Sequence, residues 1–387
     1  MKLFVLLPRF PYPLDKGDKL RAFFQLRELS KRHEITLCAL SHEPVSEGSM
    51  AAVAPFCKRI EVVRLSAAES ARGVAGAALA REPFQAGYFY SARAHRIVKA
   101  LVAETRPDHA YFQLVRTARY ARGLDVPLSL DFMDAFSWST RRMAEHQRGP
   151  LGLLRSTEAA RLLDFEGHVL ERVSRGSIIS VQDRDRIASP RRDRLLVVPN
   201  GVDLETFKPR ALEPRFDLLF VGHMSYPPNV AAADTLAREI LPLVRKHIPH
   251  ATLRIAGTSP AASVLRLRSD HVEVPGWVED MPACYASARV FVAPISIGAG
   301  MPNKVLQALA MGLPVVATPD VSGAIEGSAE VLRVSPTPEG IAGELVELLR
   351  DPNRARQIGE AGRALAESRF RWDRTTLLLE ELFARAS

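Results

Sequence analysis

Cysteine is scarce in this chain of 387 residues, which contains only Cys38, Cys57 and Cys284. Their odd number and the lack of His or Cys at metal-ligand spacing around them exclude a disulfide framework and predict no structural metal. Scattered, unpaired thiols are typical of the reducing cytosol. The sequence therefore predicts a cytoplasmic protein.

Long hydrophobic runs are also lacking. The N-terminal apolar run Leu3–Leu7 is closed by Pro8 and is too short for a signal-peptide core or a membrane span. No other stretch is long enough to cross a bilayer. With 47% hydrophobic and 25% charged residues, the chain is instead predicted to form two domains, each with its own core.

Aromatic residues make up only 7% of the chain, and no zinc-finger, RRM or helix-turn-helix signature is present. Nucleic acid is therefore not the expected partner, despite a formal net charge of +8. Basic and aromatic residues alternate between Ser66 and Lys99, where the sequence has Arg72, Arg81, Phe84, Tyr88, Phe89, Tyr90, Arg93 and Arg96. This pattern suits an anionic membrane surface or a lipid-linked substrate. A solvated charged face with a few core aromatics explains it equally simply.

Glycine is sparse where a dinucleotide fold needs it. The turn after the first predicted strand, Lys2–Leu7, has the single glycine Gly17 in place of G-x-G-x-x-G, which argues against a dehydrogenase. Asp18 is expected to cap the helix that follows. Gly17 would then lie at a helix N-terminus, either beside a ligand phosphate or acceptor hydroxyl or simply in a tight turn.

What the chain does have is a repeated α/β pattern. Buried strands are predicted at residues 35–40, 60–65, 110–114, 128–133 and 178–181. Gln113 and Arg116 follow one of these strands, at the carboxyl end where open parallel sheets bind ligands. Asp134 lies beyond another and is expected to point into the same crevice, whereas Asp131 is read as a cap or a buried hydrogen-bonding group.

The stretch from Val290 to Pro319 predicts a strand, a glycine loop, a helix and a second strand. Gly298 and Gly300 remove side chains from the loop, so that a ligand can lie against the backbone. The helix after it offers unpaired N–H groups and the positive end of its dipole to an anion such as phosphate. An ordinary βαβ crossover is the alternative.

Three motifs together resemble the group 1, or family 4, glycosyltransferases of GT-B architecture. They are VVPNGVDLETFKP, DLLFVGHMSYPPN and IGAGMPNKVLQALAMGLPVVAT. The resemblance implies two doubly wound Rossmann-like α/β domains facing across a cleft, joined near Asn200-Gly201. We expect an acceptor-binding domain over 1–205, a nucleotide-sugar-binding domain over 206–368 and a helix over 369–387 that crosses back.

The resemblance also implies a function, the transfer of a hexose from a nucleotide-diphosphate sugar, with retention and without a metal or other cofactor. The acceptor would be a glycan or a polyprenyl-linked sugar, in exopolysaccharide or cell-surface glycan synthesis. Expected donor-binding residues are Gly222, Gly298, Ala299, Gly300, Met301, Pro302, Asn303 and Gln307. Expected acceptor-binding residues are Gly17, Asp18, Gln113 and Arg116, and Lys304, Asp134 and His223 are the expected catalytic residues.

The chain departs from the family pattern at several of these positions. Ala299 and Gln307 stand where two Glu residues are common, and His223 stands where an Arg is common. Lys304, one turn into the signature helix, is then the best remaining cation for the diphosphate, unless it lies on the solvated side of that helix. Gln307 can still hydrogen-bond a ribose diol.

These departures keep a second class of function open: a degenerate relative that binds nucleotide or glycan in an assembly role. A nucleotide-sugar epimerase of the same architecture would need more carboxylates and histidines in the cleft. The leading interpretation remains an active sugar transferase, cytoplasmic or peripheral on the inner face of the cell membrane.

Overall fold

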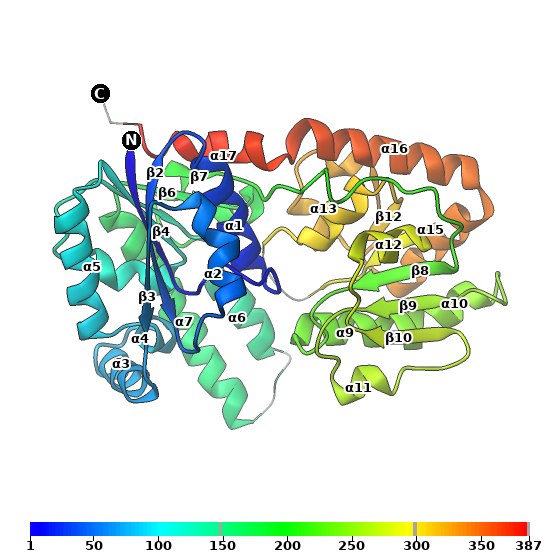
Figure 1. The fold of residues 1–387 in the computed structure, drawn as a ribbon. Helices are drawn as coiled ribbons and strands as arrows, with labels where there is room; N and C mark the ends of the chain where they lie inside the picture. The colour runs from blue at the N-terminus through cyan, green and yellow to red at the C-terminus, as the bar shows by residue number, and fades with distance from the viewer. Residues whose placement is uncertain (146, 148, 297–299, 385–387) are drawn as a thin grey trace. The chain divides into compact units, whose positions relative to one another are not determined.

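The structure is a computed structural model that describes residues 1–145, 147, 149–296 and 300–384. The chain forms two compact units, one comprising Met1–Pro199 with Thr375–Ser387 and the other Asn200–Arg374 (Figure 1). Each is built on a parallel sheet with helical crossovers, which confirms the predicted pair of doubly wound α/β domains. Their assignment to acceptor and donor stays a prediction.

The first unit contains a seven-stranded parallel sheet of order β3-β2-β1-β4-β5-β6-β7. Its strands are β1 Lys2–Leu7, β2 Glu34–Ser41, β3 Arg59–Arg64, β4 His109–Gln113, β5 Leu128–Asp131, β6 Arg175–Ile178 and β7 Leu195–Val197. Its helices are α1 Gly17–Leu29, α2 Glu47–Val53, α3 Ala67–Leu79, α4 Phe84–Tyr88, α5 Ala92–Thr105, α6 Phe136–Glu145, α7 Pro150–Arg172 and α8 Val181–Arg186. The order reverses between β1 and β4, where ligands bind in such sheets.

Successive side chains of β1 point to opposite faces of the sheet, and both faces are buried. The core of this unit therefore has two layers. Leu3, Val5 and Leu7 pack with α1, α2 and the C-terminal segment around Leu379. Phe4 and Leu6 face the opposite layer, with apolar residues of α5 and α7. The C-terminal segment thus completes the core of the first unit.

A buried ion pair joins α1 to the carboxyl end of β5. Nε of Arg21 lies 2.7 Å from Asp131 Oδ2, and both side chains are fully buried. Asp131 also accepts hydrogen bonds from Tyr111 and Ser177 on β4 and β6, at 3.1 and 2.9 Å. Its oxygens are therefore saturated by structural partners, which identifies Asp131 as a buried hydrogen-bonding group.

The second unit contains a six-stranded parallel sheet of order β10-β9-β8-β11-β12-β13. The strands are β8 Phe216–Val221, β9 Leu253–Ala256, β10 Val272–Gly276, β11 Ala288–Ala293, β12 Val315–Ala317 and β13 Leu332–Val334. The helices are α9 Pro227–Thr235, α10 Leu241–Arg245, α11 Ala262–Leu265, α12 Met281–Ala286, α13 Asn303–Ala310, α14 Pro319–Gly323, α15 Pro338–Arg350, α16 Pro352–Arg369 and α17 Trp372–Glu380. The last of these spans the boundary at Arg374, where the chain returns to the first unit.

One helix runs from Pro227 to Arg245, because α9 continues through a π-helical segment, Leu236–Ile240, into α10. Pro242 lacks the N–H that a regular α-helix would use there, which accounts for the π-helical segment. On α7, Glu166 is fully buried and accepts hydrogen bonds from the Ser137 amide and hydroxyl at 3.0 and 2.6 Å.

In the described part of the chain, no helix has both the length and the apolar character needed to cross a bilayer.

The Arg21–Asp131 pair yields a stability prediction. Arg21→Met should lower the free energy of unfolding of the first unit by about 3–5 kcal/mol, because it leaves a buried carboxylate without its cation. Arg32→Met is the matched control: Arg32 pairs with Glu380 at the surface, so its loss should cost less than about 1 kcal/mol. Urea unfolding of both variants measures the difference, and equal losses would contradict the structural role given to the buried pair.

Candidate functional site

The second unit brings its candidate residues together where the strand order reverses, between β8 and β11. Gly222 directly follows β8, and Lys304 lies in the first turn of α13, after the loop that leaves β11. A Cβ on Gly222 would lie 2.8 Å from Lys304 Nζ, so a side chain here would displace the lysine from its place against the backbone.

Lys304 lies inward and not on the solvated side of its helix. Its ammonium is 2.6 Å from Asn229 Oδ1 and 4.5 Å from the centre of the Phe220 ring. No Asp or Glu of the described residues forms an ion pair with it, and burial lowers its pKa to about 7. Lys304 is thus a desolvated cation without an anion, as a site awaiting a negative ligand would contain.

Asn229, on the first turn of α9, was not singled out from the sequence. Its side chain is almost fully buried, and its amide donates to the His223 carbonyl at 3.0 Å while its oxygen accepts from Lys304. It therefore orients the lysine against the loop after β8. A polar residue in the first turn after a ligand-binding loop was the signal that could have identified it.

His223 itself is partly exposed, and its Nδ1 lies 3.0 Å from the Ser225 hydroxyl. Its carbonyl accepts a hydrogen bond from Asn229, whereas Lys304 donates to Asn229 and not to the His223 imidazole. The structure therefore puts His223 in the loop beside the lysine, without a direct bond to it.

Gln307 lies one turn beyond Lys304 and is oriented by a buried tyrosine. The Tyr285 hydroxyl is 3.0 Å from Gln307 Oε1 and 3.0 Å from the Lys304 carbonyl, and burial raises the Tyr285 pKa well above its ordinary value. With its oxygen engaged by Tyr285, the Gln307 amide keeps its NH₂ group as a hydrogen-bond donor. A glutamate at this position could only accept.

The glycine loop is described only in part. Gly298 and Ala299 lie outside the described residues, whereas Gly300 has a φ of +82°, a conformation that favours glycine. Met301 is buried and Pro302 directly precedes α13, whose first residue is Asn303. These residues therefore form the entry to the helix that carries Lys304.

Asn200, predicted as part of the hinge, fixes this loop. It is fully buried, and its Nδ2 donates to Asn303 Oδ1 at 2.8 Å and approaches the Met301 carbonyl at 3.4 Å. The adjacent Gly201 packs against Trp372 so closely that a Cβ would meet the indole. The linker motif therefore stabilises the loop that leads into α13, in the same unit.

In the first unit, the acceptor-side candidates follow β1, β4 and β5. Gly17 is the first residue of α1, but the expected Asp18 cap is wrong: no side chain caps this helix. Asp18 instead pairs with Arg9 at 2.5 Å, and its carbonyl accepts from Gln113 Nε2 at 3.3 Å. Arg9 lies two residues after the end of β1, a position from which the sequence could have identified it.

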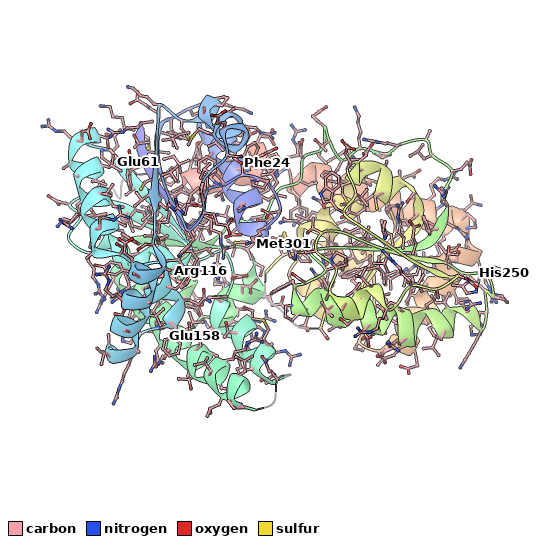
Figure 2. The ribbon with its side chains drawn as sticks, turned by 60° about the horizontal axis from the view of Figure 1, so that its bottom comes forward. Phe24, Glu61, Arg116, Glu158, His250 and Met301 are labelled. Carbon is pink, nitrogen blue, oxygen red and sulfur yellow. The ribbon has the colours of Figure 1, made fainter. Side chains whose placement is uncertain are left out.

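Arg116 lies in a short 3₁₀ helix after β4 and is labelled in Figure 2. Its guanidinium lies 4.7 Å from the Phe136 ring centre and 5.2 Å from that of Phe89. Its Nε is buried without a hydrogen-bond partner, and it forms no ion pair among the described residues. Burial, and next Arg9, lower its pKa to about 10.

Asp134 lies three residues beyond the end of β5, in a carboxylate-rich region. Burial, and next the neighbouring Asp183, raise its pKa to about 7, although Arg116 acts in the opposite direction. A carboxyl with a pKa near neutrality can exchange a proton with a ligand hydroxyl. Gln113, Arg116 and Asp134 thus lie at one edge of the sheet, and Asp18 joins them through its carbonyl, which accepts from Gln113.

The basic and aromatic segment is used in part for internal packing. Arg93 pairs with Glu69 at 3.0 Å, and Phe89 is buried, whereas Arg96, Lys99 and Tyr88 are exposed.

Within the described ranges, no group of three or more His, Cys, Asp or Glu side chains is arranged to hold a metal ion.

Comparison with known proteins gives a match in the second unit and a broader likeness in fold. Residues 215–351 match the family described as Glycosyl transferases group 1. Over 249 residues the chain is 31% identical to the GDP-mannose-dependent alpha-(1-6)-phosphatidylinositol monomannoside mannosyltransferase of Mycobacterium tuberculosis. That alignment covers 55% of this chain and 63% of the relative, so the chain spans less than two thirds of the length of the protein it matches.

Solved structures resemble the whole chain. Sucrose-phosphate synthase from Thermosynechococcus elongatus has a TM-score of 0.72 at 15% identity, covering 99% of this chain and 98% of its own. Anabaena HepE, solved in complex with UDP-glucose, has a TM-score of 0.68 at 15% identity, covering 98% and 99%. At these identities the likeness concerns the fold. Residues 215–351 thus match the group 1 glycosyltransferases, and the whole chain shares the fold of these solved structures.

Proposed function

We propose that the protein transfers a hexose from a nucleotide-diphosphate sugar to a glycan or lipid-linked acceptor. The observation that carries this proposal is Lys304: a desolvated ammonium without a carboxylate partner, beside Gly222 and at the start of α13. A diphosphate supplies the negative charge that this position lacks. The mycobacterial relative named above uses GDP-mannose, which supports a nucleotide-sugar donor.

Charge stabilisation is the main task we assign to this site. As the bond between sugar and diphosphate breaks, negative charge grows on the diphosphate, and Lys304 with the N-terminus of α13 stabilises it. Gly300, Met301, Pro302 and the Gly298–Ala299 loop would lie along the donor, and Gln307 would donate a hydrogen bond to the ribose. Asn229 holds Lys304 in position.

We further propose that transfer proceeds with retention and needs neither a protein nucleophile nor a metal. The leaving diphosphate would take the proton of the acceptor hydroxyl, and Asp134 would orient that hydroxyl. Gly17, Asp18, Gln113 and Arg116 would bind the rest of the acceptor. His223 would assist at the donor loop. Exopolysaccharide or cell-surface glycan synthesis is the setting we propose.

The three cysteines are unpaired, in keeping with the cytoplasmic location we propose. Exposed Arg96, Lys99 and Tyr88 support a peripheral contact with the anionic inner face of the membrane. A binding protein without turnover is the second candidate, favoured by Ala299 and Gln307 at the usual Glu positions. Turnover with UDP- and GDP-sugars, after a screen for thermal stabilisation, separates the two.

The first prediction concerns the pH dependence of donor binding. Lys304 is charged below its pKa of about 7 and neutral above it, so an anionic donor should bind more weakly as pH rises from 7 to 9. The loss should approach about tenfold per pH unit at most. A nucleotide-sugar is the right ligand, because its diphosphate diester does not titrate in this range. Isothermal titration calorimetry at pH 6 to 9 measures the dependence.

Lys304→Met should abolish this pH dependence and lower turnover by about tenfold to a few hundredfold. Lys246→Met is the matched control, because Lys246 is an exposed lysine directly after α10 and its loss should leave the pH dependence in place. A wild-type affinity that stays flat across this range would remove Lys304 from the donor site.

The second prediction concerns Asp134. Asp134→Asn should lower transfer while leaving nucleotide-sugar affinity unchanged, since the residue belongs to the acceptor-side unit. The substitution should also change how the free energy of unfolding depends on pH. The folded carboxyl keeps its proton up to about pH 7, whereas the unfolded one loses it near pH 4. Folding therefore loses roughly 2 to 4 kcal/mol as pH rises from 4 to 7.

The asparagine variant should lack this contribution, so the wild type should lose more stability than the variant between pH 4 and pH 7. Asp125→Asn, an exposed position in the loop before β5, is the control and should behave as wild type. Identical pH profiles for the wild type and Asp134→Asn would contradict the burial of this carboxyl, and unchanged transfer would remove it from the acceptor site.

A further inference from the structure

An apolar trough of about 580 Å³ lies on the first unit, along α3. Its floor is formed by Ala67, Ala71, Val74, Ala75 and Ala78, which recur at the spacing of one helix face. Four of these side chains are exposed alanines. Because these residues are small, this face of α3 remains open. The volume of the trough is within the ordinary range of ligand sites.

Aromatic rings line the wall of this trough opposite the helix. His42 stacks on Tyr88 with ring centres 4.5 Å apart, and both residues border the trough. Tyr88 is held there because α4 crosses α3 at Gly73 and Gly87, where a Cβ on either residue would meet the backbone of the other. The trough is therefore a fixed feature of the α3–α4 packing.

Phe89 connects the trough to the acceptor-side cluster. Its buried ring lies 5.4 Å from His42 and 5.3 Å from Tyr88, centre to centre. The same ring is approached by two guanidiniums, with Cζ of Arg9 at 5.6 Å and Cζ of Arg116 at 5.2 Å. The Phe89 ring thus lies between the apolar trough and the guanidiniums of Arg9 and Arg116.

The charge of the two arginines is only partly balanced. Asp18 pairs with Arg9 at 2.5 Å. Arg116 pairs with no carboxylate among the described residues, and its buried Nε has no hydrogen-bond partner. Guanidiniums bind phosphate oxygens with matching geometry. A phosphate group would neutralise Arg116.

We infer that this is the subsite for a lipid-linked acceptor, with a phosphate on Arg9 and Arg116 and one hydrocarbon chain along the α3 trough. The inference rests on the proposed function and specifies its acceptor. One trough accommodates one chain, so the geometry favours a prenyl phosphate or prenyl diphosphate over a two-chain phospholipid. The sugar to be extended would lie on the side of Arg116 where Asp134 is found.

Binding of farnesyl phosphate, a short single-chain prenyl phosphate, tests the inference by calorimetry. Farnesol and inorganic phosphate are the comparison ligands. The intact chain should bind farnesyl phosphate at least about tenfold more tightly than either comparison ligand, because each of those engages only half of the subsite. A soluble analogue of phosphatidylinositol with two short chains should bind more weakly than farnesyl phosphate.

Two substitutions separate the halves of the subsite. Ala75→Leu fills the trough and should weaken farnesyl phosphate at least about tenfold, the value of burying a few methylene groups. Ala68→Leu is its matched control: Ala68 is exposed on the same helix but does not line the trough, so affinity should stay within about twofold. Arg116→Gln should weaken farnesyl phosphate by about tenfold or more while leaving farnesol within about twofold.

The outcomes are distinct from those that test the proposed function. Nucleotide-sugar binding is measured on the same samples and should be unchanged in Ala75→Leu. A chain that binds donor but not farnesyl phosphate, or an Ala75→Leu variant that binds it as wild type does, would overturn the inference and leave the function standing. Tighter binding of the phosphatidylinositol analogue than of farnesyl phosphate would also overturn the inference. So would a wild type that self-associates in sedimentation experiments and an Ala75→Leu variant that does not. Failure to bind any nucleotide-sugar would count against the function itself.

Discussion

The desolvated ammonium of Lys304 is the constraint on which the donor-side structure depends. A buried cation without an anion is unfavourable, and burial alone moves its pKa to about 7. The surrounding residues do not neutralise it: Asn229 offers one neutral oxygen, Phe220 a ring face and Gly222 an open backbone. Under the proposed function, the diphosphate of the donor would supply the missing negative charge.

The first unit repeats the same arrangement at the edge of its own sheet. Arg116 is buried against Phe89 and Phe136 and has no carboxylate partner among the described residues. Nearby, Arg21 and Asp131 show the opposite case, a cation and an anion that satisfy each other and hold α1 to the sheet. The contrast distinguishes a structural charge from one that is left for a substrate.

Under the proposed function, other groups would perform the tasks of the glutamates that the family pattern has. Gln307, held by Tyr285, can donate where a glutamate would only accept. Lys304 would supply the positive charge that an arginine in the loop after β8 would otherwise provide. Such changes alter donor preference more readily than fold, because the backbone that approaches the ligand is unchanged.

The sequence by itself determined the α/β class, the doubly wound pattern and the positions of most strands. Strands buried on both faces appear as continuous apolar runs, and glycines with helix-stop signals mark the crossovers. It also determined which strand ends carry candidate polar residues. It did not reveal the burial of Glu166, since that depends on what packs against α7.

Only the tertiary structure decided which charges are compensated. Asp131 and Asp134 are three residues apart in the sequence, yet one is saturated by Arg21, Tyr111 and Ser177 while the other has a raised pKa. Arg9, Asn229 and Tyr285 entered the candidate sites only through contacts made across the fold. The burial of a side chain and the pairing of its charge depend on residues that distant strands and helices bring together. Neither can therefore be read from the sequence pattern alone.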